Sequence, residues 1–245
     1  MTSTTQAEAP SKPRSLEPLR SSVIRQVFVI VAKDLRAELR TKEAVNAALA
    51  FAIMILVLFS FVFDPAEEET KMFAGGLLWV VFAFAGTLVL NRSFARELLN
   101  DCLDALVAAP VSGAVLFLGK ALANYLLVLA VELVALPVFG IFYYVQWYQH
   151  FWQMMLVLAL GTWGITVIGT MFSALTVNIR LREVMLPMLT YPILIPALMA
   201  AMQLSVDLIN GKTIGVDTFW LKLLISFDIL YTAASLALVE IVLVG

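Results

Sequence analysis

The chain has 245 residues, of which 62% are hydrophobic and 14% charged, with a formal net charge of −2. The hydrophobic fraction exceeds the roughly 45–50% of soluble domains, which excludes an ordinary water-soluble protein. The single cysteine, Cys102, excludes an internal disulfide, and no Cys/His cluster has the spacing of a metal site or a haem attachment site. We expect no nucleic-acid partner.

The chain begins with two segments that we expect to lie outside the membrane core. Residues 1–20 are rich in Ser, Thr, Pro, Ala and Glu and are predicted to form a flexible tail. Residues 21–43 are predicted to form an amphipathic helix on the lipid surface, because apolar residues recur at four-residue spacing: Val27, Val31, Leu35 and Leu39. This helix is either a simple topogenic anchor or a part of the coupling machinery.

Residues 44–245 are predicted to form an all-α domain of six transmembrane helices. About 20 apolar residues in a helix cross the hydrocarbon layer, and continuous rather than alternating apolar runs exclude a β-barrel. The six predicted spans are Val45–Phe63, Phe73–Leu90, Val115–Ile141, Met154–Val177, Val184–Leu204 and Phe219–Val244.

The distribution of Lys and Arg predicts the orientation. Basic residues concentrate before the first span and in two loops, which contain Arg92, Arg96, Arg180 and Arg182. The first loop on the opposite side has only Lys71 among four acidic residues. The positive side faces the cytoplasm, so both termini are predicted to be cytoplasmic, in a multi-pass protein of a bacterial inner membrane.

The segment 92–110, between the second and third spans, contains a second amphipathic pattern. Leu99, Leu103, Leu106 and Val107 fall at helical spacing, with charges of both signs between them. Mixed charges favour a groove on another protein over anionic lipid. From spacing alone, docking to a partner and a plain surface helix are equally good interpretations.

Three stretches of the chain resemble the haem exporter protein B (CcmB) family of the cytochrome c maturation system. The first is Lys33–Glu43, the second is the pattern Phe94, Glu97, Leu103, Leu106, Pro110 and Lys120, and the third is Arg180–Pro196. They lie in the family's order on the predicted cytoplasmic side. The chain departs from the family's usual pattern at Leu98–Cys102, where we expect an acidic turn with glycine.

The resemblance implies the membrane permease subunit of an ABC transporter, with an ABC-2-type architecture and segment 92–110 as the coupling helix for a separate ATPase. The residues that it assigns to this coupling are Phe94, Arg96, Glu97, Asp101, Leu103, Leu106 and Pro110. The chain has no phosphate-binding GxxxxGK[ST] loop, so we expect ATP hydrolysis in the partner and no enzymatic activity here. Further implied partners are haem-handling membrane subunits and a second permease copy. In c-type cytochrome biogenesis such a complex would export haem or use ATP to release a haem-loaded chaperone. Haem is therefore a candidate cargo, with no cofactor bound directly.

Several polar residues and prolines fall inside the predicted spans. Lys120 lies near a span end, whereas Glu132 and Asp228 lie deep and need either a proton or a partner. Helix packing and a functional part are both open for these two acids. Three prolines in the fifth span predict kinks that shape the bundle or form a moving part: Pro187, Pro192 and Pro196.

The third loop contains the only histidine, His150, among Tyr and Trp residues. An aromatic belt at the membrane interface explains this loop better than a haem ligand does. Two alternatives to a permease remain. A membrane scaffold for haem-handling partners would function without ATP, and an ion-coupled transporter would depend on Glu132 or Asp228, although no inverted repeat supports it.

Overall fold

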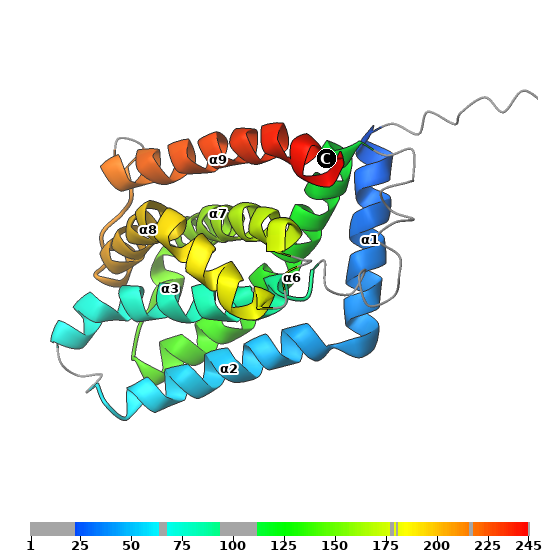
Figure 1. Cartoon of the computed structure of the whole chain (residues 1–245). Coiled ribbons are helices and arrows are strands. Elements are labelled where there is room, and N and C mark those ends of the chain that lie inside the picture. Colours follow the sequence, from blue (N-terminus) through cyan, green and yellow to red (C-terminus); the bar gives the residue numbers. More distant parts are fainter. Residues whose placement is uncertain are drawn as a thin grey trace, which may run out of the picture.

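A computed structural model describes residues 23–63, 68–93, 112–176, 179, 181–215 and 218–244. Figure 1 shows long helices running side by side and one helix lying across their ends. The helices are α1 (Val23–Thr41), α2 (Glu43–Ser60), α3 (Glu68–Leu90), α6 (Gly113–Phe142), α7 (Phe151–Thr176), α8 (Arg182–Ile209) and α9 (Phe219–Val244), with a short 3₁₀ helix, η1 (Trp147–His150), before α7.

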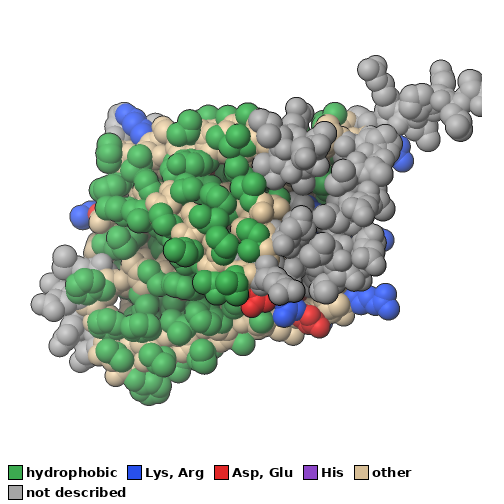
Figure 2. All heavy atoms as spheres, in the orientation of Figure 1, with side chains coloured by type: hydrophobic (Ala, Val, Ile, Leu, Met, Phe, Trp, Pro, Cys, Tyr) green, Lys and Arg blue, Asp and Glu red, His purple; other side chains and the backbone are tan. Residues whose placement is uncertain are grey.

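Six of these helices, α2, α3, α6, α7, α8 and α9, are long and apolar enough to cross a bilayer. The prediction of an all-α protein with six spans is therefore confirmed. The exposed face in Figure 2 is dominated by hydrophobic side chains over these helices, as expected for a surface in contact with lipid. α8 continues to Ile209, past the predicted end at Leu204, and runs without interruption through its three prolines.

The helices α3 and α7 form the centre of the bundle. Of the apolar stretch of each helix, 67% is buried inside the bundle in α3 and 61% in α7, whereas only 22% is buried in α2. α3 packs against α2, α6, α7 and α8, and α7 packs against α6, α8 and α9. α2 therefore lies at the edge, where most of its apolar surface is left for lipid or for another protein.

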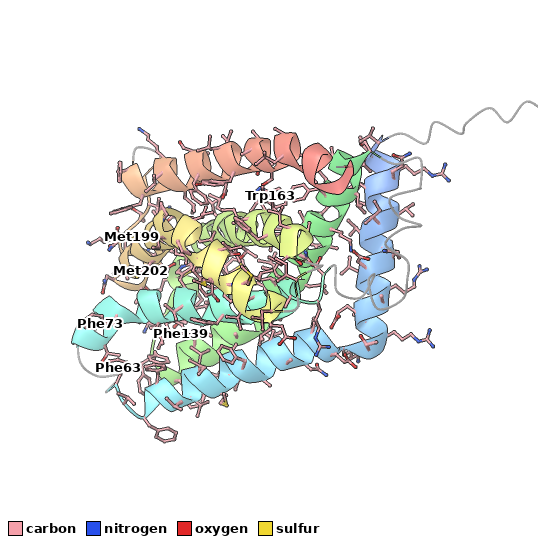
Figure 3. All side chains as sticks on the ribbon, in the orientation of Figure 1. Phe63, Phe73, Phe139, Trp163, Met199 and Met202 are labelled. Atoms are coloured by element: carbon pink, nitrogen blue, oxygen red, sulfur yellow. The ribbon has the colours of Figure 1, made fainter. Side chains whose placement is uncertain are left out.

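Close contact between the central helices depends on glycine. A Cβ atom at Gly161 of α7 would lie 2.1 Å from the ring of Trp79, so only a residue without a side chain fits there. The Trp79 indole N–H donates to the Ser205 hydroxyl of α8 at 2.9 Å. Gly76 similarly leaves room for Met202 of α8, which Figure 3 labels. These contacts join α3, α7 and α8 at small residues, as is typical of membrane bundles.

The helix α1 crosses the end of the bundle and packs against α6 (Figure 1). At Gly119 of α6, a Cβ atom would lie 2.7 Å from Ile30, so the glycine allows the two helices to touch. Between α1 and α2 the chain turns sharply at Lys42, which has a left-handed backbone with φ of 56°.

Candidate functional site: a polar junction at the end of the bundle

The turn between α1 and α2 is closed by the buried side chain of Glu38. Its carboxylate accepts hydrogen bonds from the backbone N–H groups of Ala44 at 2.8 Å and Val45 at 3.0 Å. The first N–H groups of a helix lack partners within the helix, and a negative charge at this end is favourable. Glu38 therefore fixes the angle between α1 and α2.

A second buried charge, Lys120 of α6, lies under α1. Its side chain is 1% exposed, and its ammonium group lies 3.3 Å from the Asp34 carboxylate of α1. It also donates to the backbone carbonyl of Ser93 at 3.1 Å. Asp34 contacts a second ammonium group, that of Lys33, at 3.1 Å. An ammonium group is tolerated in this buried position because a carboxylate and a carbonyl satisfy it.

One turn further along α6, Asn124 bonds the same segment. Its amide donates to the Ser93 hydroxyl at 2.9 Å and to the Thr170 hydroxyl of α7 at 2.8 Å. Ser173 of α7 donates to the carbonyl of Leu90 at 2.9 Å. That carbonyl is one of the last four of α3, and these carbonyls receive no hydrogen bond from their own helix.

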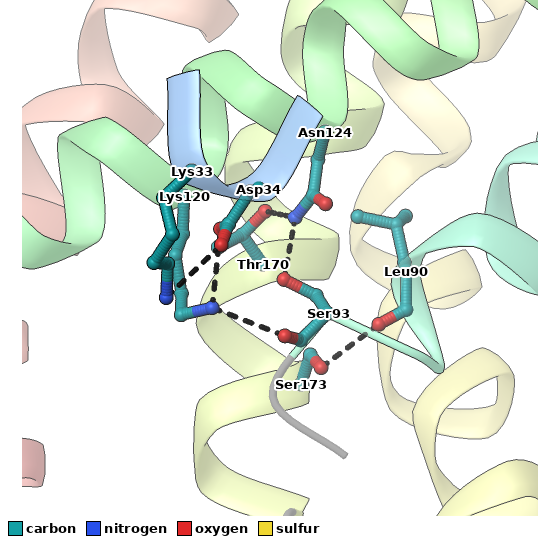
Figure 4. Close-up of polar contacts among 8 residues, drawn as sticks. All are labelled: Lys33, Asp34, Leu90, Ser93, Lys120, Asn124, Thr170 and Ser173. Carbon is teal, nitrogen blue, oxygen red and sulfur yellow. Dashed lines mark hydrogen bonds and ion pairs between the residues drawn. The ribbon is translucent and has the colours of Figure 1, made fainter. Parts of the chain in front are cut away.

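These contacts converge on the short stretch Leu90–Ser93 that ends α3 (Figure 4). Helices α6 and α7 reach it through Lys120, Asn124 and Ser173, and α1 reaches it through the Asp34–Lys120 pair. Arg92 adds an ion pair to Glu43 at the start of α2. We call the residues joined by these contacts the polar junction: Asp34, Glu43, Leu90, Arg92, Ser93, Lys120, Asn124, Thr170 and Ser173.

The polar junction includes the first residues of the predicted coupling segment, Arg92 and Ser93. Ser93, the second residue of that segment, is the last one described before residue 112. α6 then begins at Gly113, and the Ser112 hydroxyl caps it by accepting from the Val115 N–H at 3.4 Å. Lys120 lies two turns into α6 and holds Ser93. The point where the chain leaves the bundle is therefore bonded to the helix by which it returns.

The residues assigned to ATPase coupling lie outside the described residues: Phe94, Arg96, Glu97, Asp101, Leu103, Leu106 and Pro110. Of the intramembrane polar residues, Lys120 belongs to the polar junction, whereas Glu132 and Asp228 lie elsewhere in the bundle interior. Pro187, Pro192 and Pro196 are all inside α8.

Sequence reasoning did not assign Asp34, Asn124, Thr170 or Ser173 to a site. Their spacing does indicate two polar helix faces. Lys120 and Asn124 lie four residues apart on one face of α6, and Thr170 and Ser173 lie three residues apart on one face of α7. His150 lies in η1, and the described part of the chain contains no group of three or more His, Cys, Asp or Glu residues able to hold a metal ion.

Comparison with known proteins places this architecture in a family. The family model of the CcmB protein matches residues 25–241, which is nearly the whole helical part of the chain. The chain belongs to the CcmB family. The family match covers α1, all six spans and the polar junction.

Individual relatives agree with this assignment. Heme exporter protein B of Rhodobacter capsulatus is 30% identical over 210 residues, which cover 86% of this chain and 93% of the relative. The protein of the same name from Paracoccus denitrificans is 31% identical over 171 residues, covering 69% of this chain and 77% of the relative. The relatives thus match this family member over most of their length.

Proposed function

We propose that this protein is the membrane-spanning subunit of an ABC-type transporter complex in c-type cytochrome biogenesis, with haem as its cargo. The relatives are named for haem export, and this supports the cargo. Family membership also supports an inner-membrane location and association with a separate ATPase and with haem-handling membrane subunits.

The observation that carries the coupling role is the bond between Lys120 and Ser93. A segment that receives force from a partner must be anchored rigidly where it enters the bundle. Here the entry point is held by a buried ammonium group, an amide and a hydroxyl from two other helices. Movement of segment 92–110 would therefore shift α3, α6 and α7 together.

The charges on α1 support placing the polar junction at the cytoplasmic face. Arg36 and Arg40 are exposed on this helix and Lys42 is exposed just after it, and the same helix exposes apolar residues such as Ile24 and Phe28. A helix with this surface is suited to the anionic inner leaflet, with its apolar side chains among the acyl chains.

In this proposal the ATPase binds the coupling segment and changes its position during nucleotide turnover. Glu38 keeps the angle between α1 and α2 fixed and the Asp34–Lys120 pair joins α1 to α6, so a shift of α6 would be passed on to α1. α8, with three prolines in ten residues, is the helix best suited to adapt, because each proline removes one backbone donor. Two ATPase copies would require a second membrane half.

The test is co-purification of the complex with its ATPase. Glu97→Arg, or Leu103→Asp together with Leu106→Asp, should abolish the association while membrane insertion is retained. Lys120→Met should instead retain the association but reduce cytochrome c maturation. The matched control is Lys212→Met, which removes an exposed ammonium group paired with Asp207.

A catalytically inactive ATPase provides the decisive comparison. If the complex uses ATP, such a partner should bind normally and abolish maturation of c-type cytochromes. Normal maturation with the inactive partner would contradict the proposal and favour a scaffold that works without ATP.

A further inference from the structure

Three neighbouring helices bring two carboxyl groups into one layer of the bundle interior. Glu132 of α6 is 1% exposed and Asp228 of α9 is 6% exposed. Both lie about 14–15 Å along their helices from the same end of the bundle, where α6 ends and α9 begins. Residues 162–164 of α7 lie at nearly the same depth. α6, α7 and α9 all pack against one another.

The two acids contact α7 at nearly the same depth but on different sides of the helix. The Thr162 hydroxyl donates to the Oε2 atom of Glu132. Two residues further on, a Cβ atom at Gly164 would lie 2.9 Å from the Oδ1 atom of Asp228. The absence of a side chain at Gly164 thus makes room for the Asp228 carboxyl against the backbone of α7.

Trp163, between these two positions, adds further polar and aromatic contacts. Its indole N–H donates to the Thr232 hydroxyl of α9 at 3.0 Å, and its ring meets Tyr125 of α6 edge to face. Figure 3 labels Trp163 between α7 and α9. The layer therefore joins α7 to α6 and to α9 through polar side chains.

The carboxyl groups retain unused hydrogen-bonding atoms. Within the described residues, the Oε1 atom of Glu132 and both carboxyl oxygens of Asp228 are buried without a donor. Lys33 and Lys120 pair with Asp34, Arg92 pairs with Glu43, and Lys212 pairs with Asp207. These four cations are therefore bonded to other carboxylates. Beside the layer, the Tyr125 ring of α6 packs against Trp163 and is within electrostatic range of both acids.

The charge state follows from this environment. An ionised side chain in the middle of a bilayer costs at least about 2.5–3.5 kcal/mol, and a buried charge without a partner costs more. A protonated carboxyl avoids this cost. Protonation also turns one oxygen of each carboxyl into an O–H donor.

We propose that Glu132 and Asp228 form an intramembrane pair of proton-binding carboxyls, both protonated at neutral pH, one where α6 meets α7 and the other where α9 meets α7. The ligand of this site is the proton. The site goes beyond the ATP-coupled function proposed above. If a rearrangement of α7 admitted water to this layer, the carboxyl groups would release their protons to that water.

Infrared spectroscopy of the purified protein in lipid bilayers tests the protonation state directly. At neutral pH the protein should show a C=O band of protonated carboxyl groups. The band should fall by about half in Glu132→Gln or Asp228→Asn and vanish in the double variant. A band of equal size in the double variant, or carboxylate bands alone in the wild-type protein, would overturn the proposal.

Two controls test whether the band arises from this pair and whether the bound ion is the proton. Asp207→Asn removes a carboxyl that is paired with Lys212 at 3.0 Å near the end of α8, and it should leave the band unchanged. Replacing Na⁺ by K⁺ or by choline should also leave it unchanged. A band that appears only when Na⁺ or K⁺ is removed would overturn the proposal in favour of a metal-cation site.

The wild-type measurement remains informative if a variant fails to fold. Labelling aspartate with ¹³C should shift the part of the band that arises from Asp228. No shift of any protonated-carboxyl band on labelling would show that Asp228 is ionised. The readout does not depend on an ATPase, so failure of this proposal and failure of the proposed function are distinguishable.

Discussion

The ammonium group of Lys120 in α6 lies 3.3 Å from the carboxylate of Asp34 in the surface helix α1. The two residues are 86 positions apart in the sequence, and the pair joins the surface helix to the membrane bundle. We expect Lys120→Met to destabilise the protein by on the order of 3 kcal/mol, because Asp34 and the Ser93 carbonyl lose their shared donor. Thermal unfolding in detergent would measure this change.

The matched control for this prediction is Lys212→Met. Lys212 forms an ion pair with Asp207 at a similar distance, but its side chain is 70% exposed. Exposed pairs contribute about 0–1 kcal/mol, so the midpoint of unfolding should barely move. Equal losses in the two variants would show that burial does not strengthen the Lys120 pair.

Glu38 provides a second prediction, concerning the corner between α1 and α2. Glu38→Ala removes two hydrogen bonds to the start of α2 and should cost about 1–2 kcal/mol. Glu38→Gln keeps an oxygen acceptor and should cost less. Unfolding of the three proteins under the same conditions checks the order, and a larger loss for the glutamine variant would contradict it.

Two glycines allow a test of the central packing. In Gly161→Ala the new Cβ would lie 2.1 Å from Trp79, so the variant should lose about 1–3 kcal/mol through overpacking. In Gly86→Ala the nearest atoms, from Ile165 and Val128, are 3.5 Å away, which is ordinary contact. This variant should be neutral or slightly stabilised, since alanine favours the helix. Similar stability of both variants would disprove the Trp79 contact.

Cys102, the only cysteine of the chain, offers a test of orientation. If segment 92–110 faces the cytoplasm, a membrane-impermeant maleimide should label the protein in inside-out vesicles but not in intact spheroplasts. Cys102→Ser should abolish the labelling and serves as the background measurement. Labelling confined to spheroplasts would reverse the predicted topology and place the polar junction on the outer side.

The six spans could be predicted from the sequence because the thickness of the hydrocarbon layer fixes their length and composition. The end of α8 was harder to place. Ser205 and Asp207 lower the local hydropathy, yet the helix continues past both to Ile209. Ser205 is buried there and accepts from Trp79, a contact between distant parts of the chain. Hydropathy alone does not contain that information.

The candidate site was predicted only in part. The family resemblance assigned ATPase coupling to segment 92–110, and this stays a prediction because residues 94–110 lie outside the described residues. The polar junction depends on which acid meets Lys120, and hydropathy treats all the acids of the surface helix alike. Taken alone, Ser173 has no sequence signal that separates it from an ordinary small residue in a span, yet its hydroxyl bonds the end of α3.

Glu38 and Asp34 attach the surface helix to the bundle at two points, one at α2 and one at α6. Any tilt of that helix caused by a thinner leaflet or a lower density of anionic headgroups would therefore be passed through Lys120 to Ser93. Reconstituted activity should then vary with the phospholipid mixture, even when the ATPase and nucleotide concentrations are held constant.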